Sequence, residues 1–204
     1  MAINETSRVE AFSDGVFAIA ITLLVLEIKI PTPGATPLAH QLYRQWPQYI
    51  SFVIAFMVIG IMWINHHRMF TNIKRSDTVL MILNLILLIG VTALPFPTAV
   101  LAAHLGTPGE RSAVMLFNGT CVFIAFAFNM LWRYAVSKKG MMLGADANLQ
   151  AAKKLSQQYA FGPVLYAACF ALAWVSVAAS LGLNALLACF FALPPHVAVQ
   201  HLKE

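Results

Sequence analysis

Charged and polar side chains open the first apolar segment of this chain, and they are the residues most able to do chemistry. Arg8, Glu10, Ser13 and Asp14 fall within the first two turns of a run that stays largely apolar to Ile30. A charged group near the centre of a bilayer costs about 2.5 to 3.5 kcal/mol, so it normally faces a polar partner or water. We therefore expect this segment to face protein or a pore, and lipid only in part.

Two adjacent histidines, His66 and His67, are the next candidates, because imidazoles inside a membrane can hold a metal ion or haem. Neighbouring residues on a helix point about 100° apart and cannot easily ligate one ion. The sequence places no carboxylate or third histidine three or four residues away, so we expect no metal site. A satisfied interior imidazole is the simpler interpretation of His66, and a titrating His66 that makes gating sensitive to pH is the open alternative.

Reactive constellations of other kinds are missing from the sequence. It contains no nucleophile beside a base, no paired catalytic carboxylates, no phosphate-cradling loop and no zinc-binding helix motif. The three cysteines, Cys121, Cys169 and Cys189, stand inside apolar segments without the spacing of a disulfide pair or a metal site. We predict that the protein is not an enzyme and uses no cofactor and no metal.

Composition indicates that these residues lie in a membrane. Hydrophobic residues make up 60% of the chain and charged residues 10%, with a mean hydropathy of +0.75, whereas soluble domains carry about 25% charged residues. The apolar segments predict an all-α integral membrane protein, a single domain over residues 1–204 with six transmembrane helices at about 8–30, 47–70, 77–105, 111–135, 158–182 and 184–200. We expect a tight hairpin at 181–184, and the last helix is short for a bilayer core of about 30 Å.

The distribution of lysine and arginine predicts the orientation, because these side chains are retained on the cytoplasmic side. Lys29, Arg44 and Arg111 fall on one side. The other ten of the 13 basic residues fall opposite: Arg8, Arg68, Lys74, Arg75, Arg133, Lys138, Lys139, Lys153, Lys154 and Lys203. Both termini are then cytoplasmic, which requires an even number of spans. The net charge of +5 indicates topology and contact with anionic lipid, and gives no reason to expect nucleic acid.

Three short motifs on successive spans carry a resemblance to a known family. Arg8, Phe12, Ser13 and Asp14 resemble the first-helix fingerprint of the transmembrane protein 175 family, the endosomal and lysosomal potassium channels with their bacterial members. The family's second-helix motif is similar to the set Trp63, His66, Arg68 and Phe70 of this chain. Its third-helix motif is similar to the set Asn84, Leu85, Leu94, Pro95 and Phe96. From Ala113 onward the chain resembles the family only in hydropathy and helix count.

The resemblance implies a homotetrameric channel for monovalent cations, chiefly K⁺, whose first helices line the pore within the bilayer. The chain has a single copy of the fingerprint, and in this it is similar to the bacterial members of the family. This similarity implies that the protein lies in the plasma membrane. It implies pore constrictions that also select ions at Ile19, Thr22 and Leu26. It further implies a structural polar network of Arg8, Phe12, Ser13, Asp14, Trp63, His66 and Asn84, for which we favour an architectural role over direct contact with ions.

Helical spacing adds an independent argument about the first span. Gly15, Ile19, Thr22 and Leu26 are four, three and four residues apart, so they share one stripe. Four copies around an axis would stack rings of these side chains, with small Gly15 widening the vestibule. Periodicity alone favours an ordinary interhelical seam in which Thr22 bonds to its own helix, and the resemblance is what favours the pore.

The sequence contains no TVGYG-type filter, so we expect a hydrophobic constriction that blocks by dewetting and only modest selectivity for K⁺ over Na⁺. The alternative function is a secondary transporter of a small cation or solute. Many such transporters have paired halves, and we find no internal duplication here.

Overall fold

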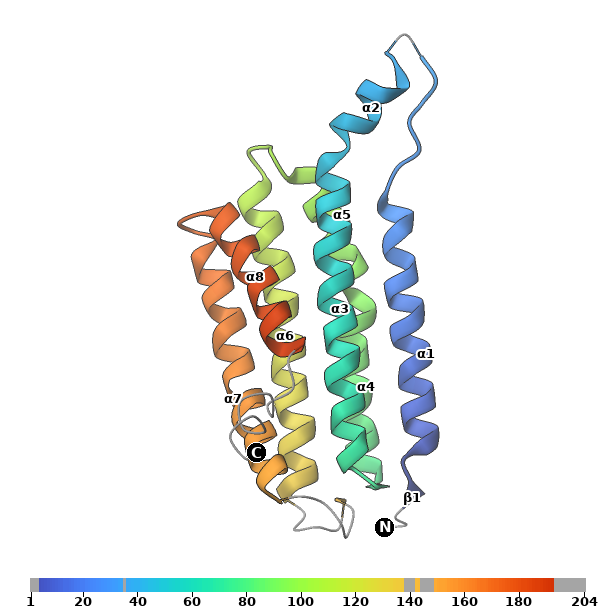
Figure 1. Ribbon diagram of the computed structural model, residues 1–204, viewed down its shortest axis with the longest axis vertical. Helices are drawn as coiled ribbons and strands as arrows, with labels where there is room; N and C mark the ends of the chain where they lie inside the picture. The colour runs from blue at the N-terminus through green and yellow to red at the C-terminus, as the bar shows by residue number, and fades with distance from the viewer. Residues whose placement is uncertain (1–3, 35, 138–141, 144–148, 193–204) are drawn as a thin grey trace, which may run out of the picture.

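The computed structural model describes residues 4–34, 36–137, 142–143 and 149–192, and in these ranges the chain is mainly a bundle of helices (Figure 1). The helices are α1 Ser7–Leu23, the 3-10 helix η1 Leu24–Glu27, α2 Leu38–Arg44, α3 Trp46–Asn72, α4 Thr78–Ala93, α5 Pro95–His104, α6 Glu110–Ser137, α7 Leu149–Leu172 and α8 Val177–Ala192. Two short strands, β1 Asn4–Glu5 and β2 Arg75–Ser76, pair where α1 begins. We call this the lower end of the bundle, as Figure 1 draws it, and the opposite end the upper end.

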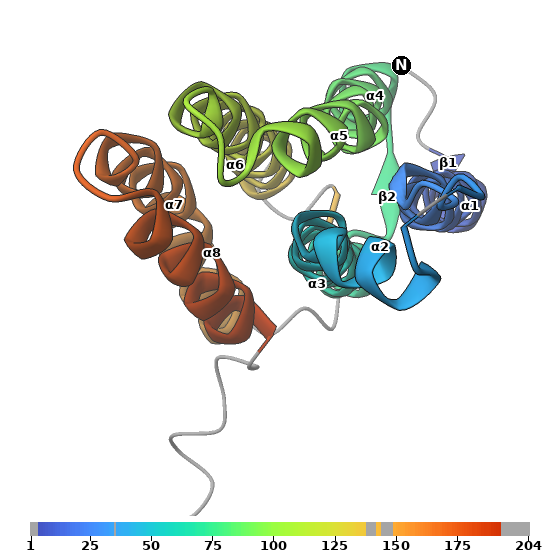
Figure 2. The ribbon, with the colours of Figure 1, turned by 90° about the horizontal axis from the view of Figure 1, so that it is seen from above.

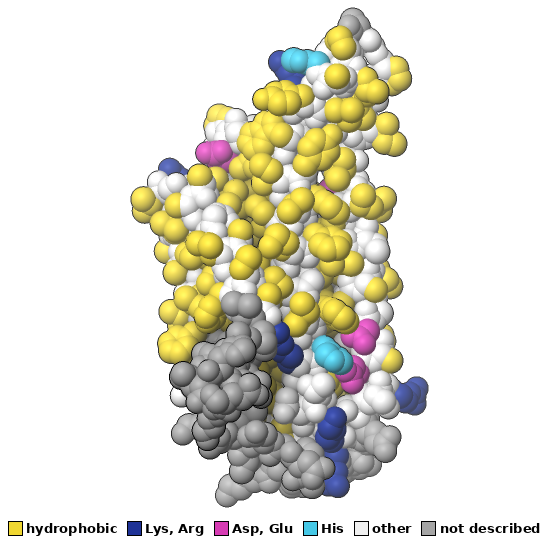
Figure 3. Space-filling model, in the orientation of Figure 1, with side chains coloured by type: hydrophobic (Ala, Val, Ile, Leu, Met, Phe, Trp, Pro, Cys, Tyr) yellow, Lys and Arg dark blue, Asp and Glu magenta, His cyan; other side chains and the backbone are white. Residues whose placement is uncertain are grey.

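Four helical segments of the described chain are long and apolar enough to cross a bilayer. They are Ser7–Glu27, Trp46–Asn72, Thr78–His104 and Glu110–Ser137. On the face drawn in Figure 3, hydrophobic side chains cover the middle, and charged and histidine side chains lie toward the two ends. The expectation of a mainly helical, multi-pass membrane protein is confirmed, whereas the count of six spans stays a prediction.

The first helix lies at one edge of the bundle, and α7 and α8 lie at the opposite edge with α3 between them (Figure 2). α1 packs against α3, α4 and α5. Only 22% of the apolar stretch of the first span is buried inside the protomer, whereas 56% of the corresponding stretch of α6 is buried. α1 therefore keeps a large surface that other parts of the same protomer leave uncovered.

Local features at three points shape the third span. Asp77 caps its start by accepting a hydrogen bond from the backbone N–H of Leu80 at 2.8 Å. Pro95 has no N–H to donate to the carbonyl one turn earlier, so α4 ends and α5 begins there. A Cβ on Gly90 would lie 2.6 Å from Cγ1 of Ile124, so this glycine permits close packing of α4 on α6.

The last two helices are displaced along the sequence from their predicted positions. The turn between them spans 173–176, and residues 181–184, where we expected the hairpin, lie inside α8. Ser176 sets the start of α8, because its hydroxyl accepts a hydrogen bond from the backbone N–H of Ala179 at 3.2 Å. The part of the predicted last helix beyond residue 192 lies outside the described residues.

Buried polar contacts explain that difference. Ser180 donates a hydrogen bond to the carbonyl of Cys169, and Asn184 donates to Oδ1 of Asn118, both at 2.8 Å. These side chains resemble a turn in the sequence, but they join α8 to α7 and α6 in the interior. Two further boundaries also differ from prediction, since the first helical segment ends at Glu27 and α7 begins at Leu149.

Candidate functional site

The first span, which consists of α1 and the 3-10 helix η1 that continues it, presents two opposite faces. Ser13, Phe17, Ala20 and Leu24 are buried against the bundle, and residues two positions further along lie about 200° around the helix. The predicted pore residues Gly15, Ile19, Thr22 and Leu26 occupy that second face, and all four are exposed in the protomer. Ile19 is 60% exposed and Leu26 is 72% exposed. The stripe therefore faces outward from the protomer, and it is not a seam within it.

Thr22 supplies the polar atom of the exposed stripe. Its hydroxyl donates to the carbonyl of Ile19 at 2.9 Å, the bond to its own helix that the seam interpretation expects. A hydroxyl that donates one hydrogen still has oxygen lone pairs available to a cation or to water. Gly15 leaves open space on the same face, because a Cβ built there meets nothing within 4 Å.

A buried row of hydrogen bonds fastens the inner face of α1 to α4 and α3. Asn84 Nδ2 donates to the hydroxyl of Ser13 at 2.9 Å, and its Oδ1 lies 3.0 Å from Nε2 of His66. Because the amide nitrogen of Asn84 is the donor to Ser13, its oxygen accepts from the imidazole. The rings of Phe17 and Phe70 flank His66 at centroid distances of 5.4 and 4.5 Å.

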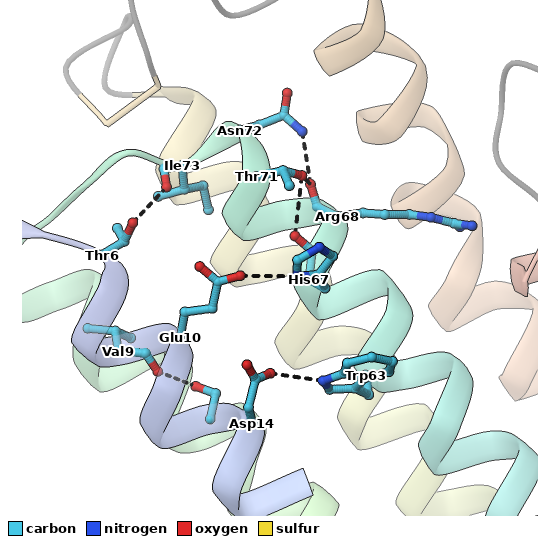
Figure 4. Close-up of polar contacts among 11 residues, drawn as sticks. Thr6, Val9, Glu10, Asp14, Trp63, His67, Arg68, Thr71, Asn72 and Ile73 are labelled. Atoms are coloured by element: carbon cyan, nitrogen blue, oxygen red, sulfur yellow. Dashed lines mark hydrogen bonds and ion pairs between the residues drawn. The ribbon is translucent and has the colours of Figure 1, made fainter. Parts of the chain in front are cut away.

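A second row of contacts joins α1 to α3 (Figure 4). Trp63 Nε1 donates to Oδ1 of Asp14 at 2.9 Å, and Nδ1 of His67 lies 3.1 Å from Oε1 of Glu10. The two carboxylates are four residues apart on α1, and their partners are four residues apart on α3, so two antiparallel helices meet at matching intervals. The pairing of Glu10 with His67 was not predicted from the sequence. The equal spacing of the two carboxylates on α1 and of their partners on α3 was the available signal in the sequence. This spacing does not specify the register between the two helices.

Arg8 and Phe12 lie apart from these two rows. Phe12 is 57% exposed, and both residues line a groove between α1 and α4 at the lower end, together with Ser76, Asn84 and Leu85. Among the described residues Arg8 has no hydrogen-bond partner. The structure thus brings together Ser13, Asp14, Trp63, His66 and Asn84 of the predicted network, but not Arg8 or Phe12.

The start of α1 is tied to the connection between α3 and α4. β1 pairs antiparallel with β2, and the hydroxyl of Thr6 donates to the carbonyl of Ile73 at 3.1 Å. Ile73 also forms a β-bridge with Leu143, so a short segment of the connection between α6 and α7 joins the same layer. Movement of α1 at the lower end must therefore disturb backbone pairing as well as side-chain contacts.

Histidine, cysteine, aspartate and glutamate side chains are dispersed in the described part of the chain. No three side chains of histidine, cysteine, aspartate or glutamate come together there in a group that could hold an ion. His66 and His67 instead contact different partners, Asn84 and Glu10 respectively.

Comparison with known proteins links this arrangement to characterised channels. The family profile of the endosomal/lysosomal potassium channel TMEM175 matches residues 8–95, the range that contains both rows of contacts. The chain is 45% identical over 193 residues to a potassium channel of Chamaesiphon minutus, covering 93% of this chain and 95% of that protein. It is 42% identical over 191 residues to a potassium channel of Streptomyces collinus, covering 93% and 92% respectively.

The similarity extends to solved structures and to vertebrate proteins. The crystal structure of a lysosomal potassium-selective channel TMEM175 homolog from Chamaesiphon minutus has a TM-score of 0.85, with 42% identity over 94% of this chain and 98% of that one. The human endosomal/lysosomal proton channel TMEM175 is 30% identical over 139 residues, which are 63% of this chain and 28% of the human protein. The near-complete match to the bacterial relatives, with the anchored first helix inside the matched range, shows that this chain belongs to the TMEM175 family of ion channels.

Proposed function

We propose that four copies of this chain form a K⁺-permeable cation channel whose pore is lined by α1. The observation that carries this proposal is the exposed stripe on α1, whose opposite face is fixed by two rows of polar contacts. A first helix at the edge of its protomer can meet its symmetry mates on a shared axis. The bacterial relatives that match nearly the whole chain are named potassium channels, which supports K⁺ as the permeant ion.

Three rings form the constriction in this proposal. Ile19 and Leu26, the first and last of these rings, are seven positions apart, or about 10 Å along the axis. Apolar rings of this kind have no ligands to replace water around an ion, so a narrow ring excludes water and a wider one passes a largely hydrated ion. The four Thr22 oxygens then provide weak neutral ligands, which favour K⁺ modestly because K⁺ gives up its water more readily than Na⁺. Gly15 widens the vestibule at the lower side of these rings.

The same proposal includes the topology. α7 and α8 serve as the fifth and sixth spans, and both termini are cytoplasmic in the plasma membrane. In support, the described basic residues are more numerous at the lower end, with Arg8, Arg68, Lys74, Arg75 and Arg133 there and Lys29, Arg44 and Arg111 at the upper end. Lower then means cytoplasmic, in agreement with the retention of basic side chains on that side.

Bilayer recording of purified protein tests the pore. We expect wild type to give unitary K⁺ currents, and Ile19→Cys to conduct until a thiol reagent blocks it. Val164→Cys is the matched control, because Val164 is 65% exposed but lies on α7 at the opposite edge of the bundle. The reagent should leave the currents of this control unchanged.

The outcomes separate a channel from a carrier. Saturating, coupled exchange without unitary currents would favour the secondary transporter. Block of the Val164→Cys variant in place of Ile19→Cys would remove α1 from the conduction path. Equal reversal potentials for K⁺ and Na⁺ would remove the role of the Thr22 ring in selectivity.

A further inference from the structure

Arg68 joins α3 to the end of α8, in a contact separate from the polar rows that hold α1. Its Nη1 donates to the carbonyl of Phe191 at 3.1 Å, and its Nη2 donates to the carbonyl of Ala192 at 2.6 Å. Asn65 Nδ2 donates to the same Phe191 carbonyl at 3.3 Å. Three donors from one turn of α3 thus reach two carbonyls in the last described turn of α8.

The Phe191 carbonyl, one of these two, needs a donor from elsewhere because of the sequence that follows. In a helix the carbonyls of Phe190 and Phe191 would accept from the residues four positions later, which are Pro194 and Pro195. Proline has no backbone N–H, so neither bond can form. A guanidinium also suits this place electrostatically, because the C-terminal end of a helix carries a partial negative charge.

The depth at which α8 ends in the bundle makes these hydrogen-bond donors more important. α8 has 16 residues, a length of about 24 Å against a bilayer core of about 30 Å. In Figure 1 the C-terminal end of α8 lies above the level at which α1 begins and α3 ends. A carbonyl without a donor is costly at such a depth, where water is scarce. Arg68 and Asn65 therefore do more than mark the membrane surface.

The same turns of α3 hold the pore helix on their other side. Trp63 and His67 contact Asp14 and Glu10 of α1 at 2.9 and 3.1 Å. In Figure 4 the Arg68 side chain extends away from those carboxylates, toward the opposite side of α3. The lower part of α3 is thus held between α1 and α8, and a change in one contact alters the position of the helix that makes the other.

We propose that Arg68 is a positioning residue for the pore: by fastening the end of α8 to α3, it fixes the two turns of α3 that anchor α1. The functional part of this inference rests on the proposed channel. Loss of the clamp frees the lower part of α3 to tilt, which loosens the contacts at Trp63 and His67. α1 then samples more arrangements, and the balance between open and closed pores changes although no pore-lining atom has been altered.

The test compares Arg68→Gln with Arg133→Gln in the full chain. Arg133 is an exposed arginine at the lower end of α6, so its replacement removes the same charge without touching α8. We expect amide hydrogen exchange in α1 to become at least about tenfold faster in Arg68→Gln, because both charge-assisted hydrogen bonds of the guanidinium are lost. Its open probability should change at constant unitary conductance, and Arg133→Gln should match wild type in both measurements. In both measurements Arg68→Lys should fall between wild type and Arg68→Gln, because one ammonium group replaces the guanidinium, which donates from two nitrogens.

Each outcome of this comparison either supports or contradicts the role of Arg68 in positioning α1. If Arg68→Gln only lowers the melting temperature, while exchange in α1 and open probability match Arg133→Gln, Arg68 is merely structural and the proposal is wrong. If Arg68→Gln does not fold, wild-type exchange and gating in Arg68→Lys overturn the proposal. Hydrogen exchange needs no conducting pore, so a wild type without K⁺ current refutes the proposed function alone, and the clamp is still judged by exchange.

Discussion

Asn84 makes the central contact among the first three spans, because its amide satisfies groups on two other helices at once. Its nitrogen donates to Ser13 on α1 and its oxygen accepts from His66 on α3, in a site where all three side chains are buried. A buried donor or acceptor left without a partner costs about 1 to 3 kcal/mol. Removing the amide leaves the imidazole N–H of His66 without a partner and takes one of the two hydrogen bonds of the Ser13 hydroxyl, which still donates to the carbonyl of Val9 at 2.8 Å. The contribution of Asn84 to the protomer is therefore larger than that of either hydrogen bond alone.

Asn84→Leu should therefore lower the free energy of unfolding by about 2 to 5 kcal/mol, with a matching fall in the melting temperature of the purified protein. Asn72→Leu is a control on α3, because among the described residues Asn72 donates only to the carbonyl of Arg68 in its own helix, at 2.9 Å. We expect a much smaller loss for the control. Equal melting temperatures for the two variants would contradict a structural role for the buried row, and so would a folded Asn84→Leu channel with altered ion preference.

Residue-scale prediction from sequence succeeded where one helix determines the answer. The stripe on α1 follows from 3.6 residues per turn, and the structure places all four of its residues on the exposed face. The pairing of Glu10 with His67 was missed, because it depends on the register between two helices. Arg68 was interpreted as a charge that sets topology. Its carbonyl partners on α8 are more than 120 positions away along the chain, so no local sequence pattern points to them.

At the scale of helices, α7 contains a proline whose cost is offset by a side chain from α6. Pro163 stands inside α7, so the carbonyl of Tyr159 receives no helical hydrogen bond from that position. Asn129 fills the gap, because its Nδ2 donates to this carbonyl at 2.9 Å. The contact holds α6 against α7 at the level where the helix would otherwise have an unsatisfied group.

Asn129→Leu should destabilise the protein by about 1 to 3 kcal/mol, the cost of leaving that carbonyl without a donor. Pro163→Ala restores a backbone N–H at the right position, so adding it to Asn129→Leu should recover much of the loss. Melting temperatures of the two single variants and the double variant measure this coupling. If the double variant simply sums the effects of the singles, the proline and the asparagine are not linked as described.

Helix boundaries show which local signals carry information. Composition and hydropathy located the first four spans to within a few residues, because the segments between them are polar or contain proline and glycine. The last pair was misplaced, because residues 181–184 were interpreted as a turn, although Asn184 bonds to α6 and the preceding Ser180 bonds to α7. Ser176, the actual N-cap, was a local signal that the hydropathy pattern obscured.

At the scale of the whole molecule, one protomer encloses no pathway along α1. Ile19, Thr22 and Leu26 face outward, so a pore along this stripe must be shared between copies of the chain. This is why hydropathy and periodicity could identify the stripe but could not distinguish a pore from a lipid-facing surface or an interface. The family resemblance favours the pore, and two residues of its first-helix motif, Ser13 and Asp14, anchor α1 to α4 and α3.

Subunit counting tests the shared pore directly. When wild type and Ile19→Asn are expressed together in varied ratios, each pore contains a mixture of the two side chains in one ring. Asparagine adds a polar group to an apolar ring and should ease its wetting, so conductance should change with each substituted subunit. A tetramer has five compositions, from no substituted subunit to four, and the recordings should fall into that many classes with binomial weights. Two classes alone, those of the pure proteins, would mean that each protomer conducts by itself and that α1 does not meet its symmetry mates at position 19.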